Sequence, residues 1–148
     1  MELSVQVQIN APVSKVFSTS TDIANCAAFI EGIKNIEILS DVKSGVGLRW
    51  IETREFYGKE ATEEMEISEL ENNKYYKVLA ESHGAKYETV LNFAEEGGGT
   101  KMEMIFTSNP QGLIAKIMSF MMGPIMKKTM IKCLEDDLES IKKYCECT

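Results

Sequence analysis

Three ionisable residues, Glu52, Arg54 and Glu63, have types and spacing that suggest chemistry. If Tyr57-Gly58 is a two-residue hairpin loop, Glu52 lies opposite Glu63 and both face inward together with Arg54. Two carboxylates that face each other favour protonation of one of them unless a cation intervenes. A protonated carboxyl group beside an arginine could polarise a carbonyl and move protons, as an aldol-type cyclisation or dehydration requires. The alternative interpretation is a structural Glu-Arg-Glu cluster at a cavity mouth, close to a hairpin end that water reaches.

Methionine is the second notable feature, because five of the nine methionines lie between residues 118 and 130. The flexible, polarizable methionine side chain suits a pocket that adapts to irregular apolar molecules. Residues 113–122 are apolar on nearly all sides, which is more than packing one helix face against a sheet requires. A ligand portal, an ordinary methionine-filled core and a contact between copies of the chain all remain open interpretations.

Several hydroxyl groups also point inward in the same strand register, where they either orient a ligand or satisfy neighbouring polar groups. With the apolar residues around them they form the predicted ligand-binding set: Trp50, Met65, Tyr76, Tyr87, Thr89, Leu91, Met102, Met104, Phe106, Ile114, Met118, Met121, Met122 and Ile125.

Other kinds of site are not supported by the sequence. His83 is the only histidine and falls in a predicted tight turn, so a nucleophilic serine or cysteine has no obvious base. Cys145 and Cys147 provide too few ligands for a tetrahedral metal site, and no metal is expected. Residues 97–99 are three glycines followed by a predicted strand, which indicates a turn and not a phosphate-binding loop. No cofactor is expected.

The elements that would position these residues follow from alternation and turn signals. Apolar residues alternate over residues 3–9, which predicts a half-buried first strand. Pro12 suits the first turn of a short helix, and Asp22 is expected to cap a second one that ends at Gly32. Residues 33–39 are predicted to form the second strand.

Two hairpins fix the register of the next strands. A loop at Tyr57-Gly58 satisfies both faces at once. It pairs Arg49 with Glu66 and Thr53 with Thr62 outside, and Leu48 with Ile67 and Trp50 with Met65 inside. A loop at His83-Gly84 pairs Glu81 with Lys86 outside, and Tyr76 with Leu91, Val78 with Thr89 and Ala80 with Tyr87 inside. A turn at Asn72-Asn73 separates the hairpins, and a strand over residues 100–108 brings the antiparallel total to about seven.

The C-terminal part is predicted to be a long helix. Met130, Leu134, Leu138, Ile141 and Cys145 form one apolar stripe at helical spacing. Gly123-Pro124 lies inside the helix, so a kink or break is expected there.

This element order, and the segments that carry it, resemble the helix-grip superfamily called SRPBCC, which includes START domains and polyketide cyclases. The matching segments are INAPVSKVF, DIANCAAFIEGIKNIEIL, GVGLRWIETREFYGKEATEEMEI and GGGTKMEMIF, followed by the terminal helix. The nearest branch is the polyketide cyclase/dehydrase-like one.

The resemblance implies an α+β helix-grip fold in a single domain over residues 1–148. A curved seven-stranded antiparallel sheet wraps around a long C-terminal helix, with two short helices between strands 1 and 2. It also implies an apolar cavity between sheet and helix that holds a lipid-like or aromatic, polyketide-like molecule.

Composition limits the partners. The chain has 148 residues, enough for one domain, and 16 Lys and Arg against 23 Asp and Glu give a net charge of −7. This balance argues against nucleic acid as a partner. The apolar stretch at residues 112–131 is interrupted by lysines and Gly-Pro, so no stable membrane insertion is expected. Four cysteines and no apolar leader predict a reduced, cytoplasmic protein. We expect a monomer or a weak homodimer.

Three functions follow, in order of preference. The first is a binding module for a hydrophobic small molecule in the internal cavity. The second is a cyclase or dehydratase that uses Glu52, Arg54 and Glu63 without metal or nucleotide. The third is a module that binds a partner protein through the acidic sheet face or the apolar start of the long helix.

Overall fold

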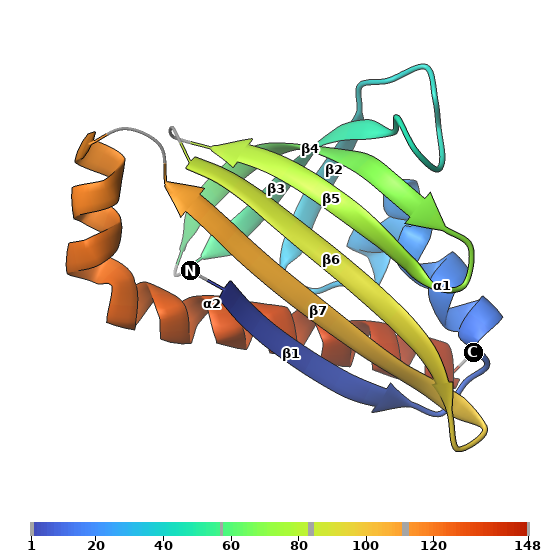
Figure 1. Ribbon diagram of the computed structural model, residues 1–148. Coiled ribbons are helices and arrows are strands. Elements are labelled where there is room, and N and C mark those ends of the chain that lie inside the picture. Colours follow the sequence, from blue (N-terminus) through green and yellow to red (C-terminus); the bar gives the residue numbers. More distant parts are fainter. Residues whose placement is uncertain (1, 57, 83–84, 111–112, 148) are drawn as a thin grey trace.

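The computed structural model describes residues 2–56, 58–82, 85–110 and 113–147, with the backbone only for residues 56, 59, 82, 85, 109, 110 and 113–126. These residues form seven strands and three helices (Figure 1). In chain order they are β1 (Glu2–Ile9), α1 (Val13–Thr21), the 3-10 helix η1 (Ile23–Ala28), β2 (Ile33–Ile38), β3 (Arg49–Phe56), β4 (Lys59–Glu71), β5 (Tyr75–Ser82), β6 (Ala85–Glu96), β7 (Gly99–Pro110) and α2 (Leu113–Cys147).

The seven strands form one antiparallel sheet with the order β1-β7-β6-β5-β4-β3-β2. The sheet is curved, and α2 crosses its concave side, where it contacts β1 and β7 (Figure 1). The two short helices lie between β1 and β2 in the chain, and α1 contacts α2. This arrangement confirms the predicted α+β helix-grip fold.

The strand register agrees with the sequence prediction in both hairpins. In the first, Arg49 lies opposite Glu66 and Trp50 opposite Met65. In the second, the inward pairs Tyr76–Leu91, Val78–Thr89 and Ala80–Tyr87 and the outward pair Glu81–Lys86 are all present. Tyr57, His83 and Gly84 lie outside the described residues, so the pairing confirms the register but not the loop conformations.

The turn between the two hairpins is also as predicted. Asn73 adopts a φ of 62°, the left-handed conformation that asparagine tolerates better than most residues. Gly97 and Gly98 have positive φ values before β7, which agrees with a turn. A Cβ atom on Gly99 would lie 2.5 Å from the backbone oxygen of Ile9, so the close approach of β7 to the end of β1 requires glycine there.

The second short helix differs from its prediction. Asp22 occupies the N-cap position of η1, but its side chain makes no capping hydrogen bond to the backbone. Its carboxylate instead accepts hydrogen bonds from the Asn25 amide nitrogen, at 3.1 and 3.0 Å. The element is a 3-10 helix that ends at Ala28, before the predicted end at Gly32, because the tighter i to i+3 turns persist only in short pieces.

The C-terminal helix α2 runs through Gly123 and Pro124 without a break. It bends sharply in its orange N-terminal part, so the predicted kink is present as a bend (Figure 1). Its C-terminal half buries the predicted stripe, including Leu134, Leu138 and Ile141. Within the described residues, no helix is long and apolar enough to cross a membrane.

The concave face is closed at one end and open at the other. At the closed end, which we define by Ile9, Val16, Phe17, Tyr76 and Phe93, α1 and the last turns of α2 cover the sheet and every side chain is buried. Phe17 packs edge-on against Tyr76 and Phe93.

The open end lies on β4, β5 and β6, towards their hairpin loops. We define it by the inward-facing residues Glu63, Met65, Ala80, Tyr87 and Thr89, all of which are half-buried. The N-terminal arm of α2 stands away from the sheet on this side of the molecule (Figure 1).

Candidate functional site

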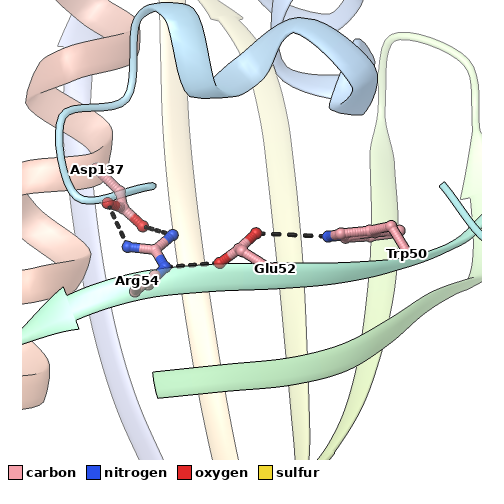
Figure 2. A network of polar contacts seen from close by, with 4 residues as sticks. All are labelled: Trp50, Glu52, Arg54 and Asp137. Atoms are coloured by element: carbon pink, nitrogen blue, oxygen red, sulfur yellow. Dashed lines mark hydrogen bonds and ion pairs between the residues drawn. The ribbon is translucent and has the colours of Figure 1, made fainter. Parts of the chain in front are cut away.

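A buried charge cluster joins β3 to α2. The Arg54 guanidinium binds both oxygens of Asp137 from α2, with Nη1–Oδ1 and Nη2–Oδ2 distances of 3.0 and 2.8 Å. The Arg54 Nε donates to Glu52 Oε2 at 2.6 Å. One guanidinium therefore connects two carboxylates across the space between the sheet and the helix (Figure 2).

The alternation of β3 explains how these side chains meet. Trp50, Glu52 and Arg54 have the same parity, so all three point to the concave face. Trp50 is 2% exposed and its indole N–H lies 3.4 Å from Glu52 Oε1, the second oxygen of that carboxylate (Figure 2). Glu52, at 6% exposure, thus has a partner for each oxygen, as a buried carboxylate requires.

The electrostatics reflect one cation shared between two carboxylates. Burial opposes the charge of Arg54, but Asp137 and Glu52 outweigh this effect and raise the pKa of the guanidinium. Burial raises the pKa of the Asp137 carboxyl group above its ordinary value, and the neighbouring Arg54 offsets this only in part. Arg54 is thus held in its charged form between the two carboxylates.

The composition of the cluster corrects the sequence prediction. Glu63 does lie opposite Glu52. The third member of the ionic cluster is nevertheless Asp137 and not Glu63, and Glu52 is buried rather than reached by water. The reason is that α2 covers this part of β3, which strand pairing alone does not reveal.

Asp137 is the site residue that sequence reasoning missed. It lies three residues after Leu134 and four before Ile141, so it belongs to the apolar stripe of the helix. A charged residue on an otherwise buried helix face needs a buried partner, and Arg54 was the inward-facing cation available. A charged residue within an otherwise apolar helical stripe was the signal that could have identified Asp137 from the sequence.

Two cysteines lie close enough to the cluster to feel its charge. Burial and the Glu52 carboxylate raise the pKa of Cys26 to about 12. Burial and Asp137 raise the pKa of Cys133 as well. Both thiols therefore stay protonated, which is the opposite of what a nucleophilic cysteine requires. The described residues contain no group of three or more potential metal ligands.

The open end carries polar groups of a different kind. Tyr87 stacks on Phe106, with ring centroids 5.5 Å apart. Burial and the Glu63 carboxylate raise the pKa of the Tyr87 phenol. Both side chains are half-buried, and the hydroxyl groups of Tyr87 and Thr89 make no hydrogen bond within the described residues but are not shielded from solvent; the buried side-chain oxygen without a partner there is Ser68 Oγ.

The remaining members of the predicted ligand-binding set lie deeper. Trp50, Tyr76, Leu91, Met102, Met104 and Phe106 are all buried in the core. The Tyr76 hydroxyl is used within the protein, because it donates to the Ser20 carbonyl oxygen at 3.1 Å and lies 2.8 Å from Ser20 Oγ. The side chains of Ile114, Met118, Met121, Met122 and Ile125 lie outside the described residues.

Two surface pockets lie away from the open end. One, of about 460 Å³, borders the charge cluster and includes Arg54, Cys133 and Asp137. The other, of about 340 Å³, lies beside the stacked rings of Phe29 and Tyr144. Apart from Arg54 in the first pocket, neither is lined by a predicted site residue.

Comparisons with known proteins agree with this fold. A family model described as "Polyketide cyclase / dehydrase and lipid transport" matches residues 1–146. No curated protein matches the chain in sequence.

Several solved structures have the same fold. The protein TTHA0849 from Thermus thermophilus superposes with a TM-score of 0.78 at 18% identity, covering 97% of this chain and 95% of that one. A START superfamily protein from Mycobacterium smegmatis also gives 0.78, at 15% identity, with 98% and 97% covered. The di-domain ARO/CYC protein StfQ from the steffimycin biosynthetic pathway gives 0.77 at 8% identity, and 98% of this chain covers 50% of that one. At these identities the similarity establishes the fold alone.

Proposed function

Since the chain belongs to the polyketide cyclase / dehydrase and lipid transport family, we propose that it binds a hydrophobic small molecule, lipid-like or aromatic, between its sheet and α2. The observation that carries this proposal is the open end of the concave face. Apolar and aromatic side chains lie there half-buried, next to hydroxyl groups without partners among the described residues. A ligand would bury the former and bind the latter.

The size of the side chains supports the same location. Ala80 lies between Met65 on β4 and Tyr87 on β6, so the smallest residue of the row lies at its middle. We propose that this small side chain between two larger ones provides the hollow in which the ligand lies. Met65 and Tyr87 would form its two walls.

A cyclase or dehydratase that uses Glu52, Arg54 and Glu63 is the alternative within the same family description. The geometry argues against these three acting together. Three nitrogen atoms of Arg54 already bind the carboxylates of Glu52 and Asp137, and Glu52 is buried. The role we propose for this cluster is to fix α2 against β3.

The remaining parts of the proposal concern the location of the protein in the cell, its oligomeric state and its partners. We propose a cytoplasmic monomer or weak homodimer that does not bind nucleic acid. The net charge of −7 and four free thiols support this assignment. Binding of a partner protein is the third alternative, and a ligand-free, partner-bound form in cells would favour it.

Native mass spectrometry of gently purified protein, followed by organic extraction, tests the proposal directly. We expect an additional mass that is lost on denaturation and recovered in the extract. A bare chain from several expression conditions, with no uptake of added hydrophobic probes, would contradict ligand binding.

A pair of variants on one strand locates the site. Ala80→Trp fills the concave side of β5, and Leu79→Trp places the same side chain on the convex side, where Leu79 is 41% exposed. We expect Ala80→Trp to weaken binding by about tenfold or more, because it occupies the hollow, and Leu79→Trp to leave binding unchanged. Equal effects of the two variants would exclude the open end as the site.

A further inference from the structure

The loop between β2 and β3, residues 39–48, turns its aliphatic side chains outward, and we infer that it docks the protein on the surface of a zwitterionic phospholipid bilayer. This inference goes beyond the proposed function, because it concerns a second surface of the molecule and holds whether or not a ligand is bound. The attachment is peripheral, since only side chains of this loop enter the interface.

Exposed aliphatic side chains are concentrated in the β2–β3 loop. Leu39, Val42 and Val46 are 40%, 44% and 56% exposed. The other exposed large apolar side chains of the described residues, Leu79 and Tyr144, lie singly on β5 and α2. The loop extends from the edge of the sheet (Figure 1). Single apolar residues are normal on a protein surface, whereas a group on one projecting loop indicates a contact surface.

Several polar groups of the loop are used within the protein. Ser40 Oγ donates to the Val42 carbonyl oxygen at 2.6 Å and accepts a hydrogen bond from the Arg49 backbone N–H at 2.9 Å. The Lys43 ammonium group donates to the Ser40 carbonyl oxygen at 3.0 Å. The backbone N–H of Gly47 also has a carbonyl partner, at 3.0 Å. Groups that are already hydrogen-bonded lose less when they leave water, which favours contact with a bilayer interface.

The charge of the loop favours a surface without net charge. The two ionisable residues of the loop, Asp41 and Lys43, have opposite charges, and the whole chain has a net charge of −7. The first residue of β3, Arg49, is a cation that is already paired with Glu64. An anionic bilayer would therefore repel the protein, whereas a zwitterionic one would not.

A second copy of the chain fits the loop less well. A specific protein–protein interface buries about 1,000 Å² or more, which three partly exposed side chains cannot supply. The adjoining edge strand β2 would have to extend the contact, but it has a register irregularity between Ile33 and Asn35 and exposed charges at Lys34 and Glu37. Both features discourage pairing between strand edges. A bilayer needs no such area, because a few inserted apolar groups already give weak, reversible attachment.

Two tryptophan reporters test the inference. Val46→Trp places an indole on the loop, and Leu79→Trp places one at an exposed position on the convex face of β5. The native Trp50 is 2% exposed, so its emission is already that of a buried indole. On addition of phosphatidylcholine vesicles at millimolar lipid, we expect the emission of Val46→Trp to shift to shorter wavelength. The emission of Leu79→Trp should stay unchanged.

Vesicle flotation measures the attachment of the unlabelled protein. At low salt, we expect phosphatidylcholine vesicles to bind at least about threefold more wild-type protein than phosphatidylserine vesicles do. Val46→Asp should weaken partitioning to phosphatidylcholine by about tenfold or more, because a carboxylate enters the interface poorly. Leu79→Asp adds the same charge at an exposed site away from the loop and should leave partitioning within about twofold of the wild-type value.

The outcomes are distinct. Equal shifts of the two reporters, stronger binding to the anionic vesicles, or no binding of the wild-type protein to either vesicle would each overturn the inference. A dimer that Val46→Asp dissociates would assign the loop to a second copy and overturn it as well. None of these results affects the proposed function, which native mass spectrometry tests without vesicles.

Discussion

The two ends of the concave face differ in how their polar groups are satisfied. At the closed end, the Thr100 hydroxyl donates to the Ala11 carbonyl oxygen at 2.8 Å, and Tyr76 and Ser20 bind each other. At the open end, the hydroxyl groups of Tyr87 and Thr89 have no such partners among the described residues. This contrast separates the part of the sheet whose hydroxyl groups are used inside the core from the part whose hydroxyl groups are open to another molecule.

The difference does not come from the strands, which are continuous from one end to the other. It comes from what covers them. The helix α1 and the last turns of α2 cover the closed end. On the side of the hairpins, the N-terminal arm of α2 bends away from the sheet (Figure 1). The Arg54–Asp137 contact joins α2 to β3 on the hairpin side of Glu52, since Arg54 lies opposite Ala61 of β4.

The change expected to disturb this arrangement most is Arg54→Ala. It leaves Glu52 and Asp137 buried without their cation, which costs about 3–5 kcal/mol of unfolding free energy. Urea denaturation measures this loss. The control is Lys34→Ala, which removes an exposed ion pair with Glu55 and should leave stability unchanged. Similar stability of the two variants would mean that the cluster does not hold α2.

Cavity-forming substitutions compare the two ends directly. Leu138→Ala, at 1% exposure, should cost about 3 kcal/mol, because the closed core cannot refill the space. Met65→Ala, at the half-buried open end, should cost about 1 kcal/mol. Thermal or urea unfolding of both variants gives the difference, and equal losses would contradict the division into a closed and an open end.

Two tyrosine-to-phenylalanine substitutions separate structural from ligand-binding hydroxyl groups. Tyr76→Phe leaves Ser20 without its partner and should cost about 1–2 kcal/mol of stability. Tyr87→Phe should change stability by less than about 0.5 kcal/mol but weaken the binding of a long-chain alcohol such as dodecanol by about threefold or more. Unfolding and binding measurements on the same preparations distinguish the two effects. A stability loss in Tyr87→Phe with unchanged binding would reverse the assignment.

The smallest expected effect is a change in the pH dependence of stability in Asp137→Asn. Burial raises the pKa of Asp137 in the folded protein, so the native state holds this proton over a pH range in which the unfolded chain has released it. The contribution to stability is complete below the ordinary aspartate pKa, and it is lost as the pH rises through the folded-state value. The wild-type protein should therefore gain stability relative to Asp137→Asn on acidification.

Denaturation of both proteins across the acidic range measures this difference. Groups with lowered pKa, such as Glu69 and Glu146, act in the opposite direction but cancel between the two proteins. Asp136→Asn, in an exposed ion pair with Lys132, is the control. A difference that shrinks on acidification would mean that Asp137 is stabilised in its charged form.

The sequence predicted the sheet better than the site. Strand register depends on local turns and on period-two alternation, so Glu52 and Glu63 could be paired before the structure was known. The partner of Arg54 depends instead on the rotation of α2 about its axis and on its height above the sheet, which no local pattern specifies. Likewise, Asp22 was a reasonable cap by residue type, but the side chain of Asn25 competes for its carboxylate.

The contact between the first strand and the last helix also determines the order in which this chain can fold. Lys142 Nζ donates to the Gln8 carbonyl oxygen at 2.7 Å, and the backbone N–H of Asn10 donates to Glu146 Oε2 at the same distance. Within the described residues, strand β1 pairs with β7 alone, about a hundred residues later in the chain. Such long loops make closure slow. During translation the first strand therefore waits, unpaired and partly apolar, until almost the entire domain has left the ribosome.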